Sequence, residues 1–289
     1  MISLQTNTTS LFAQQALNQN SNFESNTIEQ LTSGYRINSS GDDAAGLAVA
    51  NQYRADIAEL NQGVLNASNG STTLQIIDGG LNNISNILDR LQTLATESAS
   101  GTFSGNRATL DSEYQTLLTE INRQAANIGL ATSGSATGSS KYNSSALQVF
   151  IGGGDTQADS AITIDLTPAT ITITGVDVAG LNLTGTSVSG GGATPTTNAT
   201  GALTAITTAI SNLGTVQGAV GAGENLLNYA TSLANSQITN LSSAESSIRD
   251  ANVAQEAANL AQAQTLQQSS IAALAQANSM PAALLKLLQ

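Results

Sequence analysis

A run of seven apolar residues, spaced alternately by three and four positions, constrains the fold of this chain more than any other pattern. The residues are Leu74, Ile77, Leu81, Ile84, Leu88, Leu91 and Ala95. Such spacing places all of them on one face of an α-helix and is typical of a seam that packs against further helices. Because no proline precedes Pro168, this helix can run from about Asp42 to about Ser98, weakened only at its glycines. The sequence therefore predicts a mainly α-helical protein.

Other segments have the composition or the spacing of helices. We expect helices over residues 3–36, 107–128 and 201–250, and an Ala- and Gln-rich helix from Val253 to Ala277. The helix at 201–250 is expected to pack through the following residues: Leu226, Ala230, Leu233, Leu241, Ala244 and Ile248. Short connections favour antiparallel packing, so the central helices are expected to form a bundle.

The first helix, over residues 3–36, cannot be stable alone. Its stripe of eight apolar residues lies in a segment otherwise rich in Gln and Asn. Burial of a large apolar side chain contributes roughly 1.5–3 kcal/mol, whereas ordering each residue costs roughly 1–2 kcal/mol. The Ala-rich segment near the other end is the expected partner, because small residues let two helices approach closely. The fold class is therefore predicted as mainly α, a long antiparallel helical bundle or coiled coil formed by both chain ends.

The middle of the chain changes to the alternating pattern of strands. Residues 147–151, 161–166 and 170–174 alternate apolar or β-branched side chains, and the glycines from Gly152 onward supply a turn. We expect one small β-hairpin, or a patch of three strands, packed on the helices. Residues 184–200 are rich in Gly, Ser and Thr and too poor in apolar residues to form a core.

Charge and residue content argue against several classes of function. Twenty acidic residues against eight basic ones give a net charge of −12, so no nucleic-acid surface is expected. Without Cys or His the chain can form no disulfide, no thiolate metal site, no HExxH motif and no Ser-His-Asp triad. We expect no cofactor, no metal and no catalytic residue, and we interpret Asp42 and Asp43 as helix caps rather than as a catalytic pair.

Neither end of the chain suggests a membrane segment. No window of about 18 apolar residues occurs. The amino terminus lacks both the positively charged region and the apolar region that are typical of a Sec signal peptide. The last residues instead hold four leucines, Leu284, Leu285, Leu287 and Leu288. They are compatible with a short terminal helix docked on its own chain, or with a surface buried only between subunits.

Two blocks of sequence resemble the signatures of one family. Residues 31–39 read Leu-Thr-Ser-Gly-Tyr-Arg-Ile-Asn-Ser, and Asp-Asp-Ala-Ala-Gly-Leu follows at 42–47. Residues 242–252 read Ser-Ser-Ala-Glu-Ser-Ser-Ile-Arg-Asp-Ala-Asn. The first block is similar to the amino-terminal signature of bacterial flagellin, and the second to its carboxy-terminal signature. The resemblance covers about residues 1–130 and 205–289 and is lost between them, where flagellins differ from one another.

The resemblance implies a short flagellin with two inner domains. One would combine residues 1–40 with 251–289 as a terminal-helix core domain. The other would combine residues 41–183 with 201–250 as a helical bundle with a β-hairpin, and the loop at 184–200 would stand in place of outer domains. The implied function is that of a structural subunit, which polymerises into the flagellar filament for motility while its terminal helices fold on assembly.

The family also implies partners and a location. A flagellin leaves the cell through the flagellar type III export apparatus and lies in the extracellular filament, as a helical homo-polymer. Its expected partners are an export chaperone, the filament cap and the hook-junction proteins. We expect the filament core to be packed by these residues: Leu4, Leu11, Phe12, Phe23, Leu260, Leu266, Leu274, Leu284, Leu285 and Leu288.

Recognition by a host receptor is a further implication. The segment from Asp89 to Ala95 is similar to the part of flagellins that Toll-like receptor 5 binds. Arg90, Leu94 and Glu113 fall on the family's contact positions. The alternative for Leu94 is packing within the bundle, with Arg90 solvated.

Three other functions stay open at this point. A hook–filament junction protein shares the paired terminal helices, although the blocks at 42–46 and 247–250 favour flagellin. A secreted surface-binding module would use the strand patch. An enzyme is the third alternative, with almost no residue to support it.

Overall fold

A computed structural model describes residues 7–130, 146–153, 160–166, 177–178, 181–182 and 195–287 of the chain. The chain divides into two compact units. The terminal unit combines Met1–Ile57 with Thr239–Gln289, and the central unit is Ala58–Ile238. The described residues are mostly helical, as the spacing of the apolar residues predicts.

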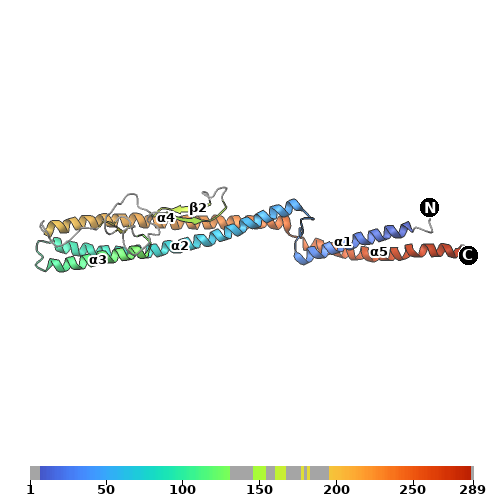
Figure 1. Cartoon of the computed structure of the whole chain (residues 1–289), viewed down its shortest axis with the longest axis horizontal. Coiled ribbons are helices and arrows are strands. Elements are labelled where there is room, and N and C mark those ends of the chain that lie inside the picture. Colours follow the sequence, from blue (N-terminus) through green and yellow to red (C-terminus); the bar gives the residue numbers. More distant parts are fainter. Residues whose placement is uncertain are drawn as a thin grey trace. The chain divides into compact units, whose positions relative to one another are not determined.

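The terminal unit contains a pair of antiparallel helices, α1 (Thr8–Ser33) and α5 (Val253–Leu287), which lie side by side (Figure 1). Asn7 caps α1 by accepting a hydrogen bond from the Ser10 backbone N–H at 3.1 Å. Hydrogen bonds join the two helices at several points along them, for example from Asn20 Nδ2 to Ser270 Oγ at 2.8 Å. The predicted pairing of the two chain ends is thus confirmed.

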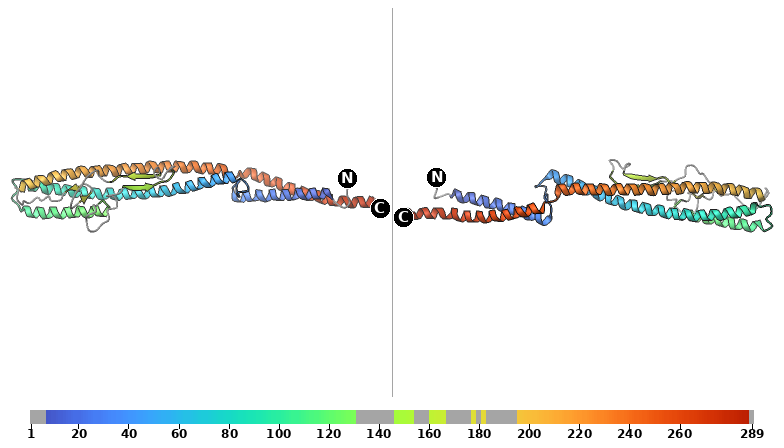
Figure 2. Two further views of the ribbon diagram at one scale, coloured as in Figure 1. Left: turned by 45° about the horizontal axis from the view of Figure 1, so that its top comes forward. Right: turned by 180° about the vertical axis from the view of Figure 1, so that it is seen from behind.

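The central unit is built on parts of three helices: α2 (Ala44–Ala99), α3 (Arg107–Asn127) and α4 (Pro195–Arg249). They run alongside one another in both views of Figure 2. All seven residues of the seam from Leu74 to Ala95 are buried, with at most 1% of each exposed. From α3, Tyr114, Leu118 and Ile121 join this core. The heptad seam therefore packs as its spacing predicts.

The face that α4 turns inward differs from the prediction. Leu226 and Leu233, expected to pack inward, are 51% and 61% exposed. The buried face of the helix is instead formed by Ile206, Ala209, Leu213, Val216, Val220, Leu227 and Ala234. The prediction is wrong at Leu226 and Leu233, because the buried line of the helix runs through Val220, Leu227 and Ala234, each seven residues after the last. The other four predicted residues, Ala230, Leu241, Ala244 and Ile248, are half-buried.

The helix bounds show where composition misleads. Helix α4 begins at Pro195, although the Gly, Ser and Thr content predicts a loop up to residue 200 and a helix from 201. Proline is well placed in the first turn of a helix, where its missing N–H has no partner to lose. The remainder of the predicted loop, residues 184–194, lies outside the described residues. At the other end, α5 continues through Pro281 to Leu287.

The predicted β-hairpin is present. Strands β1 (Leu147–Phe150) and β2 (Ala161–Ile164) pair antiparallel, with Leu147 opposite Ile164 and Phe150 opposite Ala161. A second antiparallel pair is formed by β3 (Asp177–Val178) and β4 (Leu181–Asn182). The third predicted strand, at 170–174, lies outside the described residues.

Two glycines of helix α2 mark close contacts rather than breaks. Helix α2 is continuous through Gly63 and Gly70. A Cβ on Gly63 would overlap the Ile151 carbonyl, and one on Gly70 would lie 2.8 Å from a Val149 methyl. The hairpin and the residues that follow it can therefore pack against α2 only because these positions lack a side chain.

Candidate assembly surface

The terminal helices leave large apolar side chains exposed. Phe12 is 71% and Leu11 57% exposed, while Phe23 and Leu266 are also exposed at 40% and 39%. Leu260 and Leu274 are half-buried. Of the other residues expected in the filament core, Leu4 and Leu288 lie outside the described residues, as do the side chains of Leu284 and Leu285.

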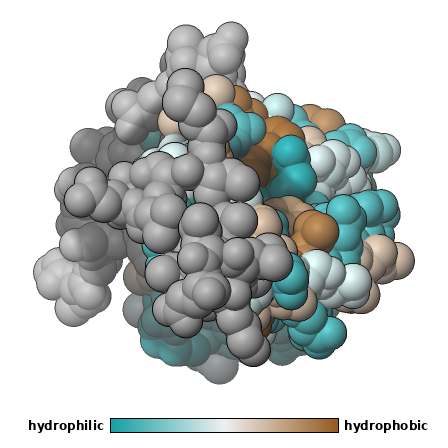
Figure 3. All heavy atoms as spheres, turned by 90° about the vertical axis from the view of Figure 1, so that its right-hand side faces the viewer, coloured by the Kyte–Doolittle hydropathy of each residue, from teal (hydrophilic) through white to brown (hydrophobic). Residues whose placement is uncertain are grey.

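The contact between α1 and α5 is made from smaller residues. The fully buried residues along this pair are Thr27, Ala263 and Ala277, with 1%, 0% and 4% exposed. Seen from the end at which the chain termini lie, apolar residues form separate brown groups among teal polar ones (Figure 3). Ala and Thr occupy the most buried positions of the contact, with half-buried leucines such as Leu260 and Leu274 beside them, so the side chains of Leu11, Phe12 and Phe23 remain on the outside.

The joint between α1 and α2 is closed by two carboxylates. Asp43 Oδ1 accepts from the Gly46 backbone N–H at 2.9 Å and caps α2, as predicted. Asp42 acts differently: its Oδ2 accepts from the backbone N–H groups of Ser39 and Asn38 at 2.8 and 3.0 Å. These two bonds, with Ser39 the stronger influence, hold the pKa of Asp42 below its ordinary value.

The glycine with left-handed backbone at this joint is Gly34, at the end of α1. Gly34 has φ of 76° and ends α1 by donating from its N–H to the Gln30 carbonyl at 2.9 Å. Gly41 is not among the glycines with positive φ. The reversal of the chain is therefore made at the end of the first helix.

Residues 34–36 meet residues 248–251 in an arrangement that local sequence patterns do not reveal. The Ala251 N–H donates to the Gly34 carbonyl at 2.9 Å, and the Arg36 N–H donates to the Arg249 carbonyl at 2.7 Å. These bonds form an antiparallel bridge between Tyr35 and Asp250. The only signal in the sequence is that both segments lie within the two family-like blocks. We refer to residues 34–36 with 248–251 as the clasp.

Side chains reinforce the clasp. The guanidinium carbon of Arg249 lies 4.1 Å from the centre of the Tyr35 ring, a cation–π contact. Arg249 also lies 4.0 Å from Glu245, with 18% of its side chain exposed. Arg36 Nη2 donates to the Ile248 carbonyl at 2.7 Å.

The residues expected to contact Toll-like receptor 5 are placed together but differ in accessibility. Arg90 and Glu113 form an ion pair at 2.7 Å between α2 and α3, and both remain substantially exposed. Leu94 is buried in the bundle, with 1% of its surface exposed. Packing is thus the observed role of Leu94, and receptor contact at these three residues stays a prediction.

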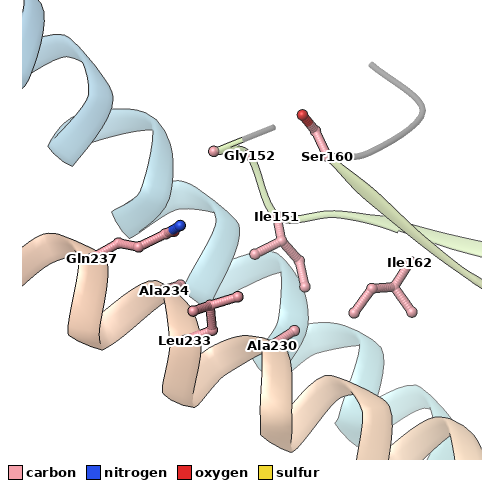
Figure 4. A pocket seen from close by; sticks show the side chains of 9 residues that line it. Ile151, Gly152, Ser160, Ile162, Ala230, Leu233, Ala234 and Gln237 are labelled. Carbon is pink, nitrogen blue, oxygen red and sulfur yellow. The ribbon is translucent and has the colours of Figure 1, made fainter. Parts of the chain in front are cut away.

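A hollow lies between the hairpin and α4. Ile151 and Ile162 face Ala230, Leu233 and Ala234 across it (Figure 4), and its volume is about 130 Å³. None of its lining residues is acidic or basic. Among the described residues, no group of three or more His, Cys, Asp or Glu side chains could hold a metal ion. Within the same residues no helix has the length and hydropathy needed to cross a membrane.

Comparisons with known proteins converge on one family. The family model of the bacterial flagellin N-terminal helical region matches residues 4–134, and that of the C-terminal helical region matches residues 203–288. A flagellin of Listeria monocytogenes is 34% identical, over 98% of each chain. The flagellar filament 33 kDa core protein of Treponema phagedenis is 31% identical, also over 98% of each chain. A crystal structure of Bacillus cereus flagellin matches 63% of this chain and 93% of its own, with 23% identity and a TM-score of 0.40. Since both terminal family models match in the expected order and the two sequence relatives align along nearly the whole chain, this protein belongs to the bacterial flagellins.

Proposed function

We propose that this protein is a structural subunit that polymerises into the flagellar filament through the exposed apolar residues of its terminal helices. The observation that carries the proposal is the exposure of Phe12, Leu11 and Leu266 on a helix pair whose own contact uses Ala and Thr. Large exposed apolar side chains that recur along a helix favour association with a further helix.

Burial between copies would supply the stability that the terminal pair lacks. Each Phe or Leu that becomes buried contributes roughly 1.5–3 kcal/mol. The free energy gained by burial exceeds the entropic cost of ordering the chain ends only when several copies meet. Folding of the chain ends is therefore coupled to polymerisation. Contacts that join one copy to the next without closing into a ring generate a helical filament.

Several finer assignments belong to the same proposal. The subunit is exported to the extracellular filament with an export chaperone, and it meets the filament cap and the hook-junction proteins. It acts without catalysis. Its inner domains divide near residues 40 and 251, with the bundle and hairpin between them. The relatives are named as flagellins and as a filament core protein, so neither the hook–filament junction protein nor the surface-binding module is favoured.

The test is seeded elongation of purified subunits, followed by electron microscopy and sedimentation. We expect the full chain to extend filament seeds, and a chain lacking residues 1–30 and 260–289 to remain monomeric. Phe12→Gln, at a site that is 71% exposed, should stop or strongly slow elongation while leaving the helical content of the monomer unchanged. Gln15→Ala, at an exposed polar position of the same helix, is the matched control. Elongation of the Phe12 variant at the rate of the unsubstituted chain would remove the main support for the proposal.

A further inference from the structure

Helix α4 carries apolar side chains on a face that does not join the core of the central unit. Leu226, Tyr229 and Leu233 are 51%, 75% and 61% exposed, and the exposed Ala222 precedes them. The four residues are separated by four, three and four positions, the spacing of a seam that packs against another helix. Leu233 also borders the hollow beside the hairpin (Figure 4). We refer to these four residues as the α4 stripe.

Helix α2 has a second exposed apolar face in the same unit. Leu65 and Ile76 are 58% and 62% exposed. They lie eleven positions apart (65 to 76), which is about three helical turns and places both on one side of α2. The α4 stripe also extends over eleven positions (222 to 233), so each face is about 16 Å long. We refer to Leu65 and Ile76 as the α2 line.

The α4 stripe and the α2 line lie at one level of the central unit and point away from each other. The two helices touch where a Cβ on Gly223 would lie 3.2 Å from a Leu74 methyl. At about 100° per residue, Leu65 lies roughly 180° around α2 from Leu74, and Tyr229 roughly 120° around α4 from Gly223. Within one subunit the stripe therefore cannot cover the line, whereas a second subunit beside it can.

Charge indicates that the partner for these faces is another copy of this chain. Copies with a net charge of −12 repel one another wherever their acidic residues approach. Helix α4 has no charged residue between Glu224 and Glu245, and α2 has none between Glu59 and Asp78. Both exposed faces lie within these uncharged stretches, so two acidic copies can meet there without bringing like charges together.

We propose that the α4 stripe of one subunit packs on the α2 line of the next subunit in the filament. The proposal rests on the proposed function and adds a contact in the central unit to the contacts of the terminal helices. Because the two faces differ, the contact can repeat from copy to copy, whereas a contact of stripe with stripe would close a pair. A contact with so few large side chains is weak alone, so a chain without its ends should still remain monomeric.

Cross-linking within filaments tests which faces meet. The chain contains no cysteine, so a disulfide between chains that carry one introduced cysteine each must join two subunits. Filament seeds are extended with an equal mixture of the Tyr229→Cys chain and either the Leu65→Cys or the Ile76→Cys chain, and the filaments are oxidised. We expect linked dimers in at least one of these mixtures. Gln92→Cys, at an exposed position of α2 beyond the line, replaces the α2 partner in the control mixture and should give few dimers.

The concentration of free subunit that remains beside filaments gives a second measurement. Tyr229→Ser should raise it roughly tenfold, since tyrosines at the centre of an interface often contribute that much to affinity. The ring is 75% exposed, so the helical content of the monomer should not change. Ser232→Ala, at an exposed position of α4 outside the stripe, is the control and should leave the concentration unchanged. If Tyr229→Ser loses helix, Leu65→Ser tests the other face of the same contact, with the same expected rise.

The outcomes separate this proposal from the proposed function. Filaments that form normally but give no more dimers than the Gln92→Cys control would overturn the contact and leave the proposed function intact. Equally strong linking in filaments of the Tyr229→Cys chain alone would also overturn it, because the stripe would then meet a second stripe. Failure of the unsubstituted chain to extend seeds would instead contradict the proposed function itself.

Discussion

Replacement of Gly63 by alanine tests how the hairpin region is held on α2. A Cβ at this position would overlap the backbone carbonyl of Ile151, which cannot rotate away as a side chain could. The Ile151 backbone is fixed further, because its N–H donates to the Ser160 carbonyl at 2.7 Å. Overpacking of this kind costs about 1–3 kcal/mol. This overpacking cost is partly offset by the gain of about 1 kcal/mol in helix stability that comes from replacing glycine by alanine.

A matched glycine in the same helix separates these two effects. Gly79 is exposed, and a Cβ there would meet nothing within 4 Å. Gly79→Ala should therefore stabilise the protein by up to about 1 kcal/mol. Since the helical gain is similar at both sites, the difference between the two variants isolates the overpacking cost, about 1–3 kcal/mol.

The measurement is the free energy of unfolding of the full chain in denaturant, with circular dichroism as the probe. Gly63→Ala should unfold at a lower denaturant concentration than the unsubstituted chain, and Gly79→Ala at a higher one. Gly70→Ala should fall between them, because its new methyl group would press on a Val149 methyl rather than on backbone. Equal stability of the Gly63 and Gly79 variants would refute the close contact with Ile151.

Further predictions concern single interactions. Arg123 and Gln124 donate to the Glu120 carboxylate and lower its pKa to about 2 from the ordinary 4.5. A lowered pKa means that this contribution to stability is present above pH 4.5 and is lost as the pH falls through about 2. Denaturant unfolding should thus find Arg123→Gln less stable than the unsubstituted chain at neutral pH and equal to it near pH 2, and an equal difference at both would contradict the pairing. Leu88→Ala, at a site with 0% exposure, should cost about 2–5 kcal/mol in thermal unfolding. Leu65→Ala, at 58% exposure, should change little, and a loss equal to that of Leu88 would contradict the assigned core. Asn106→Ala removes the cap that accepts from the Ala108 N–H and should cost about 1 kcal/mol in the same assay, and an unchanged unfolding temperature would contradict the cap.

The sequence predicts those parts of the fold that depend on local spacing. The seam from Leu74 to Ala95 repeats over three heptads, about six helical turns, so a single misread position would not change which face of the helix is predicted to be buried. Residues 147–151 and 161–166 are rich in alternating apolar and β-branched side chains and flank a run of glycines from Gly152, a pattern that predicts a hairpin. The pairing of the terminal helices follows from the Ala-rich composition of the carboxy-terminal helix, because small residues let a helix with few apolar side chains approach it closely.

Where two faces of one helix both carry apolar residues, local spacing does not show which face is buried. Helix α4 has apolar residues side by side at 226 and 227, both leucine, and again at Leu233 and Ala234, so neither spacing nor side-chain size identifies the buried member of each pair. The start of α4 at Pro195 has a related cause, since Gly, Ser and Thr content does not separate a loop from a helix that neighbouring helices stabilise.

The clasp could not be predicted from the sequence either, and the reason differs from that for α4. Its hydrogen bonds join residues more than 200 positions apart, such as Arg36 and Ile248. Backbone bonds of this kind depend on how the chain returns, and no residue type is required for an N–H to meet a carbonyl. Tyr35 and Arg249 are visible in the sequence, but nothing local shows that the ring and the guanidinium meet.

The use of small residues where α1 meets α5 connects this sequence to the proposed function. A contact built from Phe12 and Leu266 would have pinned the two helices together and stabilised the monomer, but it would have left little apolar surface for a neighbouring copy. Packing Thr27 against an Ala-rich helix keeps those side chains outside, with Leu260 and Leu274 only half-buried beside it. The clasp adds backbone hydrogen bonds at one end of the helix pair without using any of the exposed Phe or Leu side chains. The chain can therefore join its own ends through small side chains, polar bonds and a backbone bridge, and its most exposed Phe and Leu side chains stay available for a neighbouring copy.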